Sequence, residues 1–316
     1  MKAKEVIEAA RDDVARMMHV NSKEANHWVI YSAMEHFKAI YGREGKPHIV
    51  TSSIEHPSIL EPLRSLSHKG ELDGLFVFFS EHTEIGVDPS TGIVKLDDLE
   101  DALCERTVLV SVMLANNETG VIQPLAQIAD IARSGFFRAE LKRSLLLEKY
   151  LYEKTVPLQS LFRGGSQEHG KRAGTENTPM IAGLGAACRI VTERLPDFVE
   201  HMRDVRDYFE EQLKNALGDA VVIHFATSQR IPNTSSVSFV KYPGNASDLL
   251  SKISAVLSAC GILDKVAFRT VRFSFGRESS RVQVDRVVNE LKSIAFFGKY
   301  GSSLLSAINK GPLPGF

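Results

Sequence analysis

The sequence predicts an α/β fold, with a larger domain built on a mostly parallel sheet and a smaller α+β domain at the C-terminal end. Two continuous apolar runs, residues 74–79 and 107–114, are of the kind found in strands buried on both faces. Patterns with leucine or isoleucine every three or four residues, typical of helices, follow each run. Strands that alternate with helices favour a parallel sheet covered by helices on both faces.

Length and composition are those of a globular protein. The chain has 316 residues, which at roughly 150 residues per domain suggests two domains. Hydrophobic residues make up 43% of the chain and charged residues 24%. The 38 Lys and Arg against 39 Asp and Glu leave a net charge of −1, so no global field favours nucleic acid or an anionic membrane. No apolar run approaches the roughly 18 residues of a membrane span.

The cysteines and the N-terminal segment indicate a reducing compartment. Cys104, Cys188 and Cys260 lie far apart and are odd in number, so they predict neither a disulfide framework nor a metal site. Residues 1–5 are not followed by the apolar core of a signal peptide. We therefore expect a cytosolic protein without a bound metal.

Four further elements are expected in the first half of the chain. They are a helix over 4–18, a short strand over 48–53, a short helix over 96–103 and a helix from Pro124 to Gly135. Another strand should follow Gly135. Residues 136–154 are instead rich in Leu, Lys, Arg and Glu, which predicts an isolated helix.

The second half begins with a glycine-rich polar loop and a long helix over 179–217 that is interrupted near Pro196. Strands are expected near 220–225, 234–240 and 269–275, with helices near 246–259 and from Val284 onwards. We expect a large domain over 1–185, a small domain over 186–296 and a loose tail over 297–316.

Two polar clusters follow expected strands, where open sheets bind ligands. Ser52–His56 fits a helix N-terminus capped by Ser or Glu, or an imidazole that faces a pocket. Asn116–Gly120 follows the second apolar run. A turn explains one Asn and the Gly, whereas two carboxamides and a carboxylate supply more hydrogen-bonding groups than a turn requires.

Two further features suggest an anionic ligand. The glycines of the loop Gly164–Asn177 allow close backbone approach, and Lys171, Arg172 and Thr175 can meet a phosphate; a solvated charged loop is the alternative. Arg272 lies inside an apolar strand, where it binds a carboxylate ligand or points to solvent by strand alternation. Taken by themselves, these residues indicate an anionic small-molecule site in an α/β fold.

In combination, the four features resemble the class V aminotransferase-like, pyridoxal-phosphate (PLP) enzymes of the cysteine desulfurase type. The stretches that carry the resemblance are Thr51–His56, Leu114–Gly120, Gly164–Asn177 and Arg272–Arg277, in the family's order. Residues 177–185 and 201–208 resemble the selenocysteine lyase branch in particular. The resemblance runs, with gaps, from about residue 1 to 296. It implies a PLP-transferase fold of the aspartate aminotransferase type, incomplete here, with pyridoxal 5'-phosphate as cofactor.

The resemblance also implies roles for four residues. His56 matches the histidine that stacks on the pyridine ring and transfers protons, and Asn117 matches the asparagine that hydrogen-bonds the ring's phenolic oxygen. Thr175 matches the threonine that reaches the cofactor phosphate of the neighbouring subunit, which implies a homodimer. Arg272 matches the arginine that pairs with the substrate carboxylate, a task for which its planar fork is suited.

The chain lacks four motifs of the family, and a counterpart of the family's Asp-Asn-Asn-Ala-Thr-Thr-like start as well. It has neither the Ser-Gly-His-Lys motif with the Schiff-base lysine nor the preceding His-Val-Asp-Ala-Ala-Gln strand, both expected between Gly135 and Thr155. The Ser-Gly-Gly-Thr-Glu-Ser phosphate loop has no counterpart before Asn26, and the catalytic-cysteine loop has none after Ile253. Cys260 matches a helical position beyond that loop, so the catalytic cysteine is absent too.

The absent parts are blocks with well-matched flanks, which suggests omitted exons or an incomplete gene model. The remaining lysines Lys142, Lys149, Lys154 and Lys171 lie in charged or solvated settings, where a protonated amine is expected. None of them is a convincing substitute for the Schiff-base lysine.

The resemblance implies a PLP-dependent lyase that decomposes L-selenocysteine to L-alanine and reduced selenium, and the absent motifs predict that turnover is impaired. Its partners are then an amino-acid substrate and a second subunit, with no nucleic acid and no membrane. Three alternatives stay open: a catalytically dead variant that acts as a dimerisation partner, a product that never folds stably, and a cysteine desulfurase.

Overall fold

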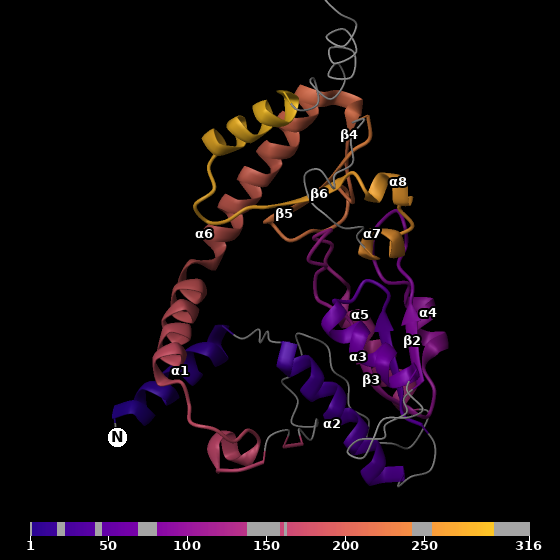
Figure 1. The fold of residues 1–316 in the computed structure, drawn as a ribbon, viewed down its shortest axis with the longest axis vertical. Helices are drawn as coiled ribbons and strands as arrows, with labels where there is room; N and C mark the ends of the chain where they lie inside the picture. The colour runs from indigo at the N-terminus through magenta and orange to yellow at the C-terminus, as the bar shows by residue number, and fades with distance from the viewer. Residues whose placement is uncertain are drawn as a thin grey trace, which may run out of the picture. The chain divides into compact units, whose positions relative to one another are not determined.

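The computed structural model describes residues 2–17, 23–41, 46–68, 81–137, 159–160, 163–241 and 255–293 (Figure 1). The expected strand over 74–79 and the tail over 297–316 lie outside these residues, as does nearly all of the expected helix over 136–154. The chain divides into two compact units. Unit 1 comprises Met1–Asp88, Ile93–Leu114 and Gln123–Leu195, and unit 2 comprises Pro89–Gly92, Ala115–Ile122 and Pro196–Phe316.

Unit 1 contains a parallel sheet with the strand order β2-β1-β3. Strand β1 is His48–Ser52, β2 is Glu81–Ile85 and β3 is Thr107–Ser111, and β2 and β3 both run parallel to β1. The expected parallel sheet is confirmed, with two of its strands close to their expected places. The sequence does not predict β2, because its Glu-His-Thr-Glu-Ile run is charged and mostly outside the core, as is typical of edge strands.

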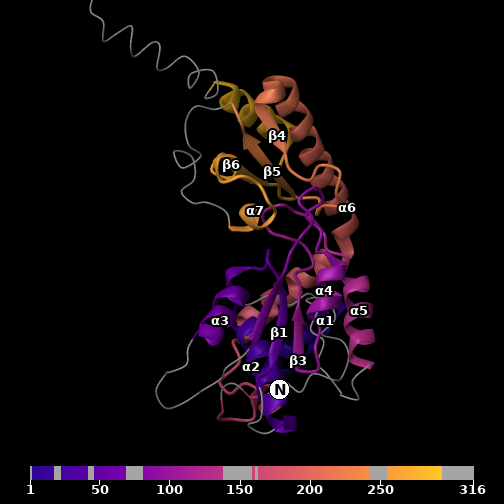
Figure 2. The ribbon, with the colours of Figure 1, turned by 90° about the vertical axis from the view of Figure 1, so that its right-hand side faces the viewer.

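Helices cover both faces of this sheet, as expected (Figure 2). Successive side chains of a strand point to opposite faces, so neighbouring residues of β1 enter different cores. The core around Ile49 and Leu109 includes residues of α2 (Lys23–Tyr41) and α3 (Pro57–His68). The core around Val50 and Val110 includes residues of α4 (Leu96–Ala102) and α5 (Leu125–Phe137).

Two expected helix boundaries are wrong. Helix α5 continues past Gly135 to Phe137, because a single glycine costs a helix only about 1 kcal/mol. Helix α6 (Thr178–Leu217) runs through Pro196 without the expected interruption, although a proline inside a helix removes one N–H donor. The proline nevertheless marks the change from unit 1 to unit 2 along α6.

In unit 1, the first part of α6 packs against α1 (Lys2–Met17), the helix expected over 4–18. Gly185 permits this approach, because a Cβ at that position would lie 2.8 Å from the Cα of Ala10. The ion pair between Arg189 and the buried Asp13 also joins the two helices.

Unit 2 is a smaller α+β assembly. Its sheet is antiparallel in the order β4-β5-β6, with β4 at Val221–Ile223, β5 at Thr234–Phe239 and β6 at Thr270–Ser274. The second part of α6 and the helix over residues 281–293 share a core with the sheet, formed by Phe209, Leu213, Val237, Phe275 and Val284 among others. Two short helices, α7 (Ala255–Ala259) and α8 (Asp264–Ala267), precede β6. Across all described helices, none is long and apolar enough to cross a membrane.

Candidate functional site

His56 begins helix α3 in unit 1 and caps it with its own ring. The backbone N–H of Ser58 donates to His56 Nδ1 at 3.1 Å, and the N–H of Ile59 donates to the His56 carbonyl at 2.8 Å. Pro57 occupies the first helical position, where its missing N–H costs nothing. The expected cap by Ser or Glu is therefore wrong. Because Nδ1 accepts a hydrogen bond, the neutral ring carries its proton on Nε2, and the ring is exposed.

Glu55 joins the ends of two neighbouring strands. Its carboxylate is buried and accepts the backbone N–H of Met113 at 2.5 Å, so it links the turn after β1 to the segment after β3. Sequence reasoning treated Glu55 as a helix cap and missed this role. The only available signal was a carboxylate between Ile54 and His56 at the end of a buried strand.

The two asparagines of the turn over 115–122 in unit 2 have different environments. Asn116 is buried, and its side-chain oxygen accepts the backbone N–H groups of Glu118 and Thr119 at 2.8 and 2.9 Å. Gly120 closes the turn with φ +78°. One Asn and the Gly thus build the turn, while the side chain of Asn117 is exposed.

Arg272 contacts the same turn. Its Nη1 donates to the backbone carbonyl of Asn117 at 3.0 Å. The side chain is exposed, so strand alternation does point it away from the core. A guanidinium has five N–H donors, and this contact leaves enough of them for a forked pair with a carboxylate. The structure therefore brings together Asn117 and Arg272, two of the four expected site residues.

The loop over 164–177 in unit 1 is mostly exposed and is organised by its own polar groups. The Gln167 side chain accepts the N–H of Gly174 at 3.3 Å, and Asn177 accepts the N–H of Met180 at 3.4 Å at the start of α6. Gly170 and Gly174 have φ +75° and +119°, which favour glycine. Thr175 is exposed in this loop. His56 and Thr175 thus lie in unit 1, and Asn117 and Arg272 in unit 2.

Cys260 does not have the surroundings of a nucleophile. It is buried after α7, and burial together with the nearby Glu118 raises the pKa of its thiol to about 11. Since the thiolate is the reactive form, this cysteine is inert at neutral pH. Within the described ranges, no three His, Cys, Asp or Glu side chains are grouped as a metal site would need.

Three comparisons place the chain among known proteins. The aminotransferase class-V family model matches residues 1–137. The selenocysteine lyase of Bos taurus is 32% identical over 92% of this chain and 84% of its own length, and the human one is 32% identical over 92% and 82%. A solved NifS-like protein superposes with a TM-score of 0.78 at 28% identity, covering 94% of this chain and 89% of its own.

The comparisons also bear on the absent blocks. The match to the bovine lyase extends over 373 aligned positions, more than the 316 residues of this chain, so internal blocks of that relative have no counterpart here. The family model stops at residue 137, where α5 ends and where the Schiff-base motif is expected to follow.

The described residues include no lysine suited to covalent attachment of PLP. In unit 2, Arg272 lies beside the backbone of Asn117, and in unit 1 the N–H of Ser58 orients the ring of His56. A Schiff-base lysine needs a site that removes its proton, whereas each described lysine whose burial is defined is exposed: Lys38, Lys46, Lys95, Lys171, Lys214, Lys241, Lys265 and Lys292. Lys142, Lys149 and Lys154 lie outside the described residues. With lyase relatives at 32% identity over 92% of its length, the chain belongs to the class-V aminotransferase family, in the PLP-dependent branch of selenocysteine lyases and cysteine desulfurases.

Proposed function

We propose that this chain is a selenocysteine lyase homologue that recognises the carboxylate of a selenocysteine-type amino acid but turns it over poorly. The contact of Arg272 with the Asn117 carbonyl carries the proposal, because it sets a forked cation beside the residue that matches the family's cofactor-binding asparagine. The absence of the Ser-Gly-His-Lys motif accounts for the impaired turnover. We place the protein in the cytosol as a homodimer in which Thr175 reaches the neighbouring subunit.

Selenocysteine is favoured over cysteine as the substrate class by the relatives. The lyases of Bos taurus and Homo sapiens are both 32% identical to this chain, and the cysteine desulfurase IscS of Vibrio cholerae is 29% identical over 92% of this chain and 81% of its own length. A cysteine desulfurase remains the nearest alternative activity.

The decisive experiment adds PLP to the purified protein and records the visible absorption band before and after borohydride. Mass spectrometry of the reduced product then locates any pyridoxyl-lysine, and selenide release from L-selenocysteine is measured in parallel. We expect no reducible band and no release above background. A band that maps to one lysine, together with selenide release, would refute the proposed impairment and identify a substitute for the missing residue.

Recognition is tested separately by calorimetric titration with L-cysteine in the absence of PLP. We expect weak binding that the Arg272→Met variant loses. The matched control is Arg277→Met, because Arg277 is an exposed arginine of the same segment that pairs with Glu278. Equal binding by both variants would remove Arg272 from the proposed site.

A second candidate function, a catalytically dead dimerisation partner, is favoured by the exposed apolar residues in the first half of α6. Met180 is 69% exposed and Leu184 51%, and Ile190 and Leu195 are also exposed. They follow the loop that carries Thr175, the residue matched to a contact with the neighbouring subunit. We expect co-expression with a full-length homologue to give a soluble mixed dimer, and Leu184→Glu to abolish it. If the chain stays insoluble with and without the full-length homologue, it would instead be a product that never folds stably.

A further inference from the structure

The turn that carries Asn117 is held in unit 2 by the chain segment over 229–231. The backbone N–H of Ile122 donates to the Gln229 carbonyl at 2.9 Å, and the N–H of Ile231 donates to the Gly120 carbonyl at 2.8 Å. Val121 and Arg230 face each other as an antiparallel bridge between these two bonds. Any group that fixes residues 229–231 therefore also fixes the turn of Asn117.

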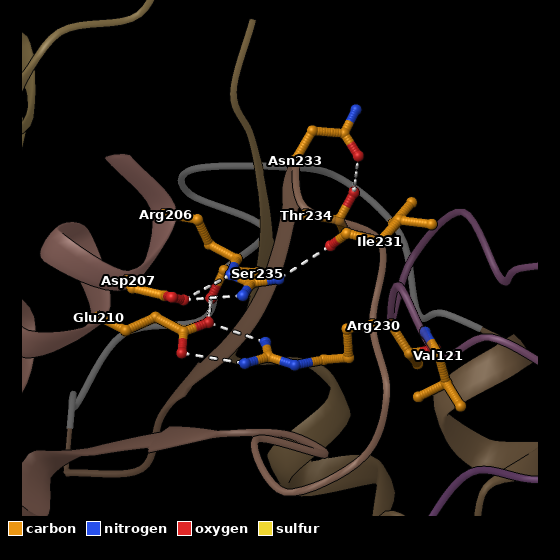
Figure 3. Close-up of polar contacts among 10 residues, drawn as sticks. Val121, Arg206, Asp207, Glu210, Arg230, Ile231, Asn233, Thr234 and Ser235 are labelled. Atoms are coloured by element: carbon orange, nitrogen blue, oxygen red, sulfur yellow. Dashed lines mark hydrogen bonds and ion pairs between the residues drawn. The ribbon is translucent and has the colours of Figure 1, made fainter. Parts of the chain in front are cut away.

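Two arginines fix this segment to α6, as Figure 3 shows. Arg230 donates from both terminal nitrogens to Glu210, at 2.7 and 3.0 Å, and the two side chains are only 5% and 12% exposed. The buried Arg206 donates from Nη1 to the Ile231 carbonyl at 2.9 Å and is itself bound by Asp207. Arg206 and Glu210 are four residues apart on α6, so one face of the helix holds two consecutive residues of the segment.

The same carboxylate also reaches the strand next to Arg272. The Ser235 hydroxyl on β5 donates to Glu210 Oε1 at 2.7 Å. The next residue of β5, Ser236, pairs with Arg272 on β6, and Arg272 donates to the Asn117 carbonyl. The contacts form a closed circuit: Arg230 connects Glu210 to the turn of Asn117, and Ser235 connects Glu210 to β5, where the next residue, Ser236, pairs with Arg272.

We propose that Arg230 and Glu210 are positioning residues for the amino-acid site, whose ion pair fixes the turn of Asn117 relative to Arg272. The inference rests on the proposed function only in what the site binds. A buried ion pair that served stability alone could be replaced by apolar residues of similar volume with little loss of stability, because the desolvation of the two charges offsets their attraction. The forked geometry and the shared Ser235 contact supply what such residues cannot, namely a fixed direction for each connection.

The test replaces the pair by Arg230→Met together with Glu210→Leu, which keeps apolar volume and leaves no buried charge alone. We expect only a modest fall in the urea midpoint, because the buried Ser235 hydroxyl loses its acceptor while no buried charge is left alone. The amides of Ile122 and Ile231 should exchange with deuterium about tenfold faster, the effect of losing about 1.4 kcal/mol in local opening. The amide of Phe239, which donates to the Arg269 carbonyl at 2.9 Å, should be unchanged.

The matched control is the Arg281→Met, Asp204→Leu double variant. Arg281 also makes a forked pair with a carboxylate of α6, at 2.6 and 3.2 Å, but this pair is exposed and none of its described contacts reaches the turn. It should leave the exchange of Ile122 and Ile231 as it was. Arg230→Lys keeps the charge and loses the fork, so it should accelerate both amides even if the double variant does not fold.

Unchanged exchange of Ile122 and Ile231 in a folded Arg230 variant would overturn the proposal, because the pair would then be purely structural. A second readout is the dissociation constant for L-cysteine without PLP, which should rise about tenfold in the Arg230→Met, Glu210→Leu protein and stay constant in the control. If the original protein binds no L-cysteine, the proposed function fails, and the exchange rates still decide whether the pair positions the turn.

Discussion

Acid should destabilise unit 2 through His224. This side chain shares a 2.5 Å hydrogen bond with the Ser238 hydroxyl, which in turn bonds the Thr270 hydroxyl. Burial lowers the pKa of His224 from 6.5 to about 4, because the interior disfavours the charged ring. The folded protein therefore keeps His224 neutral at pH values where the unfolded chain already binds a proton.

The sign and size of the effect follow from this difference in pKa. Stability falls with decreasing pH wherever the unfolded state binds more protons, here from about pH 6.5 down to about pH 4. Each unit of pKa difference corresponds to 1.36 kcal/mol, so the free energy of unfolding would fall by up to about 3 kcal/mol once His224 of the unfolded chain is fully protonated. Between pH 7 and pH 5 the expected loss is about 2 kcal/mol.

The assay is urea unfolding followed by circular dichroism at pH 7 and pH 5, with the original protein and His224→Gln. Glutamine keeps a hydrogen-bonding group but never becomes charged, so the variant should lose about 2 kcal/mol less over this pH interval. His201→Gln is the control, since His201 is an exposed histidine of the same unit that bonds the Ser279 carbonyl. An identical loss in the original protein and in His224→Gln would refute the reasoning.

Three further predictions concern single residues. Glu55→Ala should lower the free energy of unfolding by about 1–3 kcal/mol, because the buried Met113 N–H loses its acceptor. Glu55→Gln keeps an acceptor oxygen and should retain most of that free energy, and thermal melts of both variants check this. Gly120→Ala should cost about 1–2 kcal/mol through its φ of +78°, as measured by urea unfolding, whereas equal stability would show that the turn relaxes. Iodoacetamide at pH 8 should alkylate the exposed Cys104 and leave Cys260 unmodified until the protein unfolds, as read from peptide masses.

Two strands of the parallel sheet could be predicted because each is built around apolar residues, Ile49 and Val50 in β1 and Val108 to Val110 in β3. All residues of β1 are buried, and four of the five in β3, so neither strand shows the alternation of a half-exposed strand. β2 could not be predicted, because its charged residues are those of a solvated segment and only its pairing with β1 makes it a strand. Pro196 misled the helix prediction, because the local chemistry of a proline predicts an interruption whereas α6 continues through it.

The candidate site could be predicted as a set of residues but not as a set of contacts. Turn chemistry alone cannot tell which asparagine enters the turn, because Asn116 and Asn117 are adjacent and chemically identical. The Arg230–Glu210 pair joins residues on α6 and on the segment before β5, and no pattern of spacing reveals such a tertiary contact. The sequence thus predicted that one Asn and the Gly of residues 116–120 build a turn, but not this contact between α6 and the segment before β5.

The distribution of these contacts separates the circuit around Asn117 and Arg272 from the absent blocks. The circuit that connects Asn117, Arg230, Glu210 and Arg272 lies wholly within unit 2. The missing lysine motif belongs between residues 135 and 155, in a range assigned to unit 1. Since no described contact of the circuit passes through that range, the loss of the motif leaves the contact between Arg272 and the Asn117 carbonyl in place. On the proposed function, the chain would therefore keep recognition of the substrate carboxylate where turnover is lost.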